Sequence, residues 1–143
     1  MSIINESRIK KYLPADIKIK LSVHSGCANP VSARLFESLG ADSINLVPDL
    51  DLPMLAAVRR ATNCVLDIFT DTAADAGGFI RTPQVAEIIA LCSPVFLKCG
   101  PVSQQSQNHL PTEQEITERI KQVRCVHESI ERSGLNLKQL NEA

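Results

Sequence analysis

The chain has 143 residues, 44% of them hydrophobic, which is enough for one domain with a sizeable buried core. Its 15 Lys and Arg residues balance 16 Asp and Glu residues without a basic run, which argues against a nucleic acid as the primary partner. No apolar stretch reaches about 18 residues, and the N-terminus does not resemble a secretory signal. We therefore expect no membrane partner and a cytoplasmic location.

The first predicted element is an N-terminal helix over residues 1–14. Ile3, Ile4, Ile9 and Leu13 recur at helical spacing among charged residues, and Pro14 ends the segment. We expect this helix to pack against one end of the domain.

A strand followed by a helix then recurs about four times along the chain. Short apolar strands are predicted over residues 17–25, 43–49, 65–71 and 95–100, and helical periodicity follows each of them. This alternation predicts a single α/β domain of parallel (β/α) units over residues 1–143. In such architectures the active site lies at the C-terminal ends of the strands.

Capping residues mark where the helices begin. The strongest signal is the pair Thr112 and Glu115, a capping box that opens a long amphipathic helix over residues 112–134, ending near Gly134. A polar residue one or two positions before a proline marks the start of each earlier helix. The caps expected for these are Asn29, Asp51 and Thr82.

The two faces of the predicted strands differ in polarity. Successive side chains of a strand point to opposite faces, so Ile44 and Leu46, like Leu66 and Ile68, belong to an apolar face that suits packing against helices. The opposite face is polar. Its residues are His24, Asn45, Asp49, Asp67, Asp71 and Lys98.

This polarity favours a barrel over an open doubly wound sheet. Helices cover both faces of an open sheet, so polar residues in mid-strand would be costly there, whereas one face of a barrel lines the interior. A complete barrel needs roughly 250 residues. Four units in this chain therefore predict half of a TIM-type barrel, and a homodimer would close it. A fragment and an open sheet are the alternatives.

Lys98 is the most informative single residue. A lysine at the end of a barrel strand binds a substrate carboxylate or phosphate, or attacks a carbonyl group as a Schiff-base nucleophile. The structural alternative is an internal ion pair with Asp67, which is itself a candidate general base or metal ligand. The candidate catalytic residues are Lys98, Asp67 and His24.

The loop after the third strand is a candidate ligand-binding loop. Gly77 and Gly78 would bind a phosphate through backbone N–H groups, with Arg81 nearby, although a simple turn is the structural alternative. The polar ends of the second and third strands lie at the same edge of the sheet. The expected substrate-binding residues are Asn45, Asp49, Asp71, Gly77, Gly78 and Arg81.

The five cysteines are odd in number and include no C-x-x-C pair, so we expect reduced thiols and no metal site. His24 and Cys27 are close enough to meet as metal ligands or as base and nucleophile, but a soft-metal site needs further ligands, for which only Cys99 is a candidate. A strand-end histidine beside an inert thiol is the structural alternative. The roles of Cys27 and Cys99, and any cofactor, stay open.

Three segments carry a family resemblance. Residues 40–50 (GADSINLVPDL), 77–81 (GGFIR) and 93–98 (SPVFLK) resemble TIM-barrel proteins known as collagenase-like peptidases of unknown catalytic type. The likeness spans residues 20–100 and implies a (β/α) barrel with hydrolase activity. Members of that broad family also modify tRNA with iron–sulfur chemistry, and this chain lacks the cysteine cluster for such chemistry.

These observations predict a barrel-type enzyme, or part of one, that acts on a small polar or peptide-like substrate. One alternative is a Schiff-base lyase or aldolase that uses Lys98. The other is a non-catalytic half-barrel that requires a partner chain to cover its sheet edges.

Overall fold

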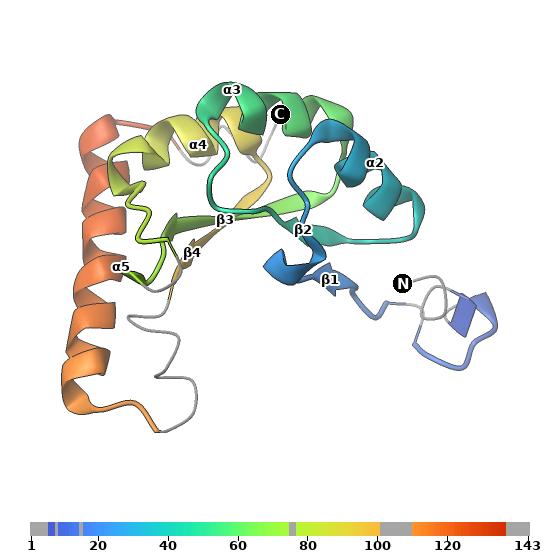
Figure 1. Ribbon diagram of the computed structural model, residues 1–143, viewed down its shortest axis with the longest axis horizontal. Coiled ribbons are helices and arrows are strands. Elements are labelled where there is room, and N and C mark those ends of the chain that lie inside the picture. The colour runs from blue at the N-terminus through green and yellow to red at the C-terminus, as the bar shows by residue number, and fades with distance from the viewer. Residues whose placement is uncertain (1–5, 8, 15, 75–76, 101–109, 137–143) are drawn as a thin grey trace.

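The computed structural model describes residues 6–7, 9–14, 16–74, 77–100 and 110–136. Over these residues the chain forms an α/β fold with a four-stranded parallel sheet in the order β1-β2-β3-β4 (Figure 1). The strands are β1 (Lys20–Leu21), β2 (Ser43–Asn45), β3 (Val65–Asp71) and β4 (Val95–Cys99). The helices are α2 (Pro30–Ser38), α3 (Leu52–Ala61), α4 (Val85–Cys92) and α5 (Glu113–Ser133).

The helices pack on one face of the sheet. In Figure 1, α2, α3 and α4 lie side by side over the strands, and α5 stands at the end of the row. The core between these layers contains the apolar strand residues, among them Ile44, Leu66 and Ile68. A second cluster joins Val126 of α5 to α4 and β4. The opposite face of the sheet has no helix on it within the described residues.

Side-chain caps open three of the four helices as the sequence predicts. The Asn29 side chain accepts from the backbone N–H of Ser32 at 2.9 Å, and Asp51 accepts from Met54 at 2.8 Å. Thr112 forms the predicted capping box with its partner three residues on, and Gly134 ends α5 with φ 69°. These positions confirm the predicted starts of α2, α3 and α5, because each cap satisfies N–H groups that have no partner within the helix.

The start of α4 differs from the prediction. Thr82 does not cap the helix but begins a short 3₁₀ turn, η3 (Thr82–Gln84), and α4 follows from Val85. Neither Arg81 nor Gln84 supplies a side-chain cap here. Proline at the second position of this turn has a fixed φ that suits 3₁₀ geometry as well as a first helical turn, so the sequence signal was ambiguous.

The first strand is much shorter than predicted. Only Lys20 and Leu21 pair with β2, and the chain then turns into the 3₁₀ helix η1 (Val23–Ser25), which ends at Gly26 with φ 66°. The Ser22 side chain accepts a hydrogen bond from the backbone N–H of His24, and this local bond competes with strand pairing. The second strand also ends early, at Asn45. The third spans residues 65–71 as predicted, and the fourth ends one residue before its predicted boundary.

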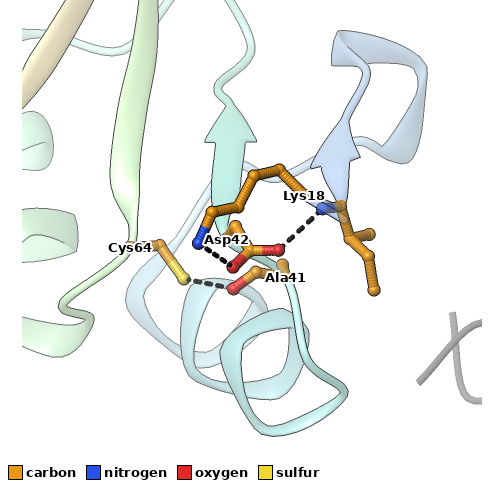
Figure 2. Close-up of polar contacts among 5 residues, drawn as sticks. Lys18, Ala41, Asp42 and Cys64 are labelled. Carbon is orange, nitrogen blue, oxygen red and sulfur yellow. Dashed lines mark hydrogen bonds and ion pairs between the residues drawn. The ribbon is translucent and has the colours of Figure 1, made fainter. Parts of the chain in front are cut away.

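Asp42 fixes the start of β1 beside β2. Its carboxylate accepts from the backbone N–H of Ile19 at 2.6 Å and lies 3.5 Å from the Lys18 ammonium group, as Figure 2 shows for the lysine contact. Next to it, the Cys64 thiol donates to the Ala41 carbonyl oxygen at 3.0 Å (Figure 2). These side-chain bonds hold the N-terminal edge of the sheet together where β1 has few ladder bonds.

The predicted N-terminal helix over residues 1–14 lies partly outside the described residues. In the described part, residues 6, 7 and 9 are helical and the chain turns at Lys10, so the helix ends before Leu13. The positive φ of Lys11, 60°, accompanies this early end. None of the described helices combines the length and the apolar character that a membrane-spanning segment requires.

Candidate functional site

The face of the sheet that carries no helix holds a cluster of polar side chains from all four strands. We call Lys20, Asn45, Asp67 and Lys98 the strand-face cluster. Asn45 on β2 is the register partner of Asp67 on β3, and Lys98 on β4 is the partner of Phe69. Alternation along the strands places these residues opposite the helix-facing core.

Asp67 is the most deeply buried charge of the cluster. Its side chain is 0% exposed, and its Oδ2 lies 2.7 Å from the Nζ of Lys20, which is 52% exposed. The contact is an ion pair by distance, although neither carboxylate oxygen accepts a well-directed hydrogen bond within the described residues. The Lys20 ammonium group also lies 5.1 Å from the centroid of the Phe96 ring. Asp67 is therefore neutralised but incompletely hydrogen-bonded.

Lys98 has different partners from those of Lys20. The Asn45 amide is oriented so that its nitrogen donates to the backbone carbonyl oxygen of Asp67 at 3.1 Å. In this orientation the amide oxygen accepts from Lys98 Nζ at 2.9 Å. The same ammonium group lies 4.8 Å from the centroid of the Phe69 ring. Both contacts suit a cation, because amide oxygens and aromatic faces carry negative electrostatic potential.

The structure assigns the ion pair of Asp67 to Lys20 and not to Lys98. The structural alternative of an Asp67–Lys98 pair is therefore wrong, and within the described part of the chain Lys98 has no carboxylate within ion-pair distance. The sequence prediction missed Lys20 as a site residue. The signal was available, since Lys20 lies two residues before Ser22, on the polar side of the alternation that singled out His24.

Six of the predicted site residues lie outside the cluster, and His24 and Asp49 are the two among them that are exposed near the ends of the first two strands. His24 is exposed on η1, where its backbone N–H bonds to Ser22, and Asp49 is exposed in the loop between β2 and α3. Within the described residues, no hydrogen bond or ion pair joins either side chain to a cluster residue. The predicted strand brought His24 onto the polar face only because the strand was expected to continue to residue 25.

Asp71 and Gly78 line a separate cavity of about 570 Å³ between the β3–α4 loop and α5. The Asp71 carboxylate accepts from Thr70 Oγ1 at 3.1 Å and from the backbone N–H of Gly100 at 3.2 Å. Gly77 and Gly78 have positive φ values of 101° and 61°. None of the four cluster residues lines this cavity, so Asp71 and Gly78 lie in a different place from Asn45.

Arg81 is not placed to bind a phosphate from solvent. Its side chain is buried, only 6% exposed, and its Nε donates to Gln84 Oε1 at 3.3 Å. Burial lowers the pKa of the guanidinium group, and Nη1 has no hydrogen-bond partner within the described residues. Arg81 is therefore not the exposed cation that the predicted anion-binding loop of Gly77 and Gly78 would use.

The cysteines do not form a metal or nucleophile site with His24. Cys27 is fully buried, its Sγ lies 3.5 Å from Ser32 Oγ, and burial raises the pKa of its thiol. Cys99 lies elsewhere, where it accepts from Thr70 Oγ1 at 3.6 Å. All five thiols are unpaired, and the described residues contain no group of three His, Cys, Asp or Glu side chains that would hold a metal ion.

No protein-family model, curated protein or solved structure matches this chain. The chemistry of the strand-face cluster therefore has to be argued from its geometry.

Proposed function

We propose that this chain is half of a TIM-type barrel and part of an enzyme that binds a small polar or peptide-like substrate on the helix-free face of its sheet. The observation that carries the proposal is the strand-face cluster. Charged and amide side chains from four neighbouring parallel strands converge on a face that would be the interior of a closed barrel. The hydrolase part of the proposal comes from the resemblance to collagenase-like peptidases alone.

Binding of a dipeptide tests the substrate part. We expect glycylglycine to shift the backbone amide NMR signals of Asn45, Asp67 and Lys98, and we expect Lys98→Ala to abolish these shifts. Arg124→Ala is the control, because Arg124 is a cation exposed on α5 that lies outside the cluster and does not line the cavity beside Asp71. Shifts that persist in Lys98→Ala would remove this residue from the site.

A second copy of the chain is the partner that we propose for closing the barrel. The four strands of the described residues, taken twice, give the eight that a closed barrel requires. On α5 the exposed residues Ile116, Ile120 and Val123 form an apolar stripe, and Arg119 of the same helix donates to the Cys99 carbonyl oxygen of β4 at 2.7 Å. Such a stripe beside the outer edge of β4, which has no partner strand within the described residues, marks a surface for association.

Light scattering over a concentration series tests this closure. A dimer that Ile120→Glu converts into a folded monomer would support it. A monomer at all concentrations would contradict it and would leave the substrate proposal to the NMR titration.

A Schiff-base role for Lys98 is less well supported by the geometry. Its Nζ contacts an amide oxygen and an aromatic face, which are partners of an ammonium cation and not of a neutral amine nucleophile. Borohydride trapping with small aldehydes and ketones would separate the two roles, since only a Schiff base gives a stable adduct at Lys98. The cytoplasmic location remains part of the proposal, and the five unpaired thiols suit a reducing compartment.

A further inference from the structure

We infer that the ligand of the strand-face cluster carries a single carboxylate group, which binds the Lys98 ammonium group, together with an apolar part that packs on Phe96. This inference rests on the proposed function, since it names the class of substrate for the same site. The charges, hydrogen-bond capacity and exposed apolar surface of the cluster each support it.

The charges of the cluster leave one cation without a counterion. The cluster carries two lysines and one aspartate, and Asp67 is already paired with Lys20 at 2.7 Å. Lys98 is half-buried and has no carboxylate partner within the described residues. A partly desolvated ammonium group gains more from an opposite charge than one in bulk water. The cluster thus lacks one negative charge.

The hydrogen bonds of Lys98 leave it able to donate to that charge. An ammonium group has three N–H donors, and Asn45 accepts from one of them at 2.9 Å. The Asn45 amide is itself held, because its nitrogen donates to the Asp67 carbonyl oxygen. The Phe69 ring restricts the ammonium group on a further side. Nζ is therefore held in place before a ligand arrives, which lowers the entropic cost of binding.

A carboxylate fits this site better than a phosphate does. Two lysines and one aspartate sum to one positive charge, which matches a monoanion. Phosphate sites use backbone N–H groups at helix N-termini or glycine-rich loops, or the fork of an arginine. Here the strand N–H groups serve the parallel ladder, and Arg81 is buried against Gln84.

Phe96 supplies the apolar surface. Its ring is on the same face, in register with Asp67, and remains 54% exposed although Lys20 lies over it. An exposed ring beside a charged anchor favours a ligand whose carboxylate is attached to an aliphatic or aromatic group.

The test compares matched probes in NMR titrations of the full chain. We expect sodium isobutyrate to shift the backbone amide signals of Asn45, Asp67 and Lys98, and its neutral analogue isobutyramide to bind about tenfold more weakly, because a charge-assisted hydrogen bond is replaced by a neutral one. Sodium chloride at the same ionic strength corrects for screening. Inorganic phosphate is the third probe, and it is expected to bind more weakly than isobutyrate.

One isosteric substitution tests the role of Lys98 directly. Asn45→Asp places a carboxylate beside Lys98 without changing the size of the side chain, so we expect isobutyrate binding to fall by about tenfold or more. Arg124→Gln on α5 is the control and should bind as the unchanged chain does. If Asn45→Asp does not fold, Lys98→Gln keeps the inference testable, because it removes the charge and retains a polar side chain.

The outcomes separate this inference from the proposed function. Equal binding of isobutyrate and isobutyramide, tighter binding of phosphate, or undiminished binding by Asn45→Asp would overturn the carboxylate assignment and leave a polar-substrate site in place. Strand signals that respond neither to these probes nor to glycylglycine would overturn both. A response to isobutyrate but not to glycylglycine would support the carboxylate and remove the peptide-like substrate.

Discussion

The two faces of the sheet are made of alternate residues of the same strands, yet they are buried in different ways. Leu66 and Asp67 are neighbours on β3 and both are 0% exposed. Leu66 is covered by the helices, whereas Asp67 lies on the face without helices, with Lys20 and Asn45 over it and beside it. Long lysine stems can exclude water while their ammonium groups reach solvent. A buried side chain on the helix-facing side of the sheet is covered by apolar packing. A buried side chain on the other side is covered by its charged and polar neighbours.

The largest effect should come from the helix-facing side. Leu66→Ala removes a fully buried side chain and should lower the free energy of unfolding by about 2–5 kcal/mol. Phe96→Ala on the helix-free face is the matched substitution and should cost clearly less, because the ring is half exposed. Urea unfolding followed by circular dichroism measures both. Equal losses would contradict the difference between the faces.

The thiol of Cys92 adds a pH dependence to the helix-facing core. Burial raises the pKa of this thiol from its ordinary value of 9.0 to about 11. Below pH 9 the thiol is protonated in both states and the full stability is present. Between pH 9 and 11 the unfolded chain loses the proton first, so stability falls as pH rises, by about 2–3 kcal/mol. Cys92→Ala should lose this part of the slope in urea unfolding at each pH, and an unchanged slope would show that the other thiols cause it.

The charge pair on the helix-free face should have a smaller effect than the core. Lys20→Ala leaves the buried Asp67 carboxylate without its partner and should cost about 1–3 kcal/mol. Asp67→Asn in the same chain should recover part of the loss, because no buried charge then remains. A double-mutant cycle by urea unfolding gives the coupling energy. If the two losses are additive, the coupling energy is zero and the Lys20–Asp67 pair does not stabilise the fold.

The smallest effect belongs to the first turn of α5. Thr112→Ala removes the cap from the first turn of α5 and should cost about 1 kcal/mol. Thr112→Ser keeps the hydroxyl group and serves as the control. The measurement is thermal unfolding of the two variants side by side. A loss as large as that of Leu66→Ala would show that α5 is as important to the core as the strands are.

The sequence predicted the elements that alternation and capping residues mark, and missed the short first strand, which a local hydrogen bond ends early. The third strand and the starts of three helices follow from alternation and from single capping residues, and they were correct. The first strand was wrong because the Ser22 hydroxyl bonds to the backbone of His24 within an apolar segment that otherwise favours a strand. Local hydrogen bonds of this kind leave no mark in a hydrophobic pattern.

The candidate site was also predicted only in part, because alternation assigns residues to a face but does not show which of them pair. Alternation placed Asn45, Asp67 and Lys98 on one face, as the structure does. The partner of Asp67 could not be predicted, because Lys20 and Lys98 both lie on that face and only the three-dimensional arrangement decides between them. The burial of Arg81 was equally invisible, since a charged residue in a glycine-rich loop ordinarily lies in solvent.

The unequal lengths of the two outer strands bear on how this protein behaves at high concentration. β1 pairs through two residues and offers little edge to another chain, whereas β4 presents five. Until it is covered, the β4 edge is where unintended aggregation during expression would begin. A lysine near the middle of an edge strand opposes such stacking by electrostatic repulsion, so Lys98 also favours solubility.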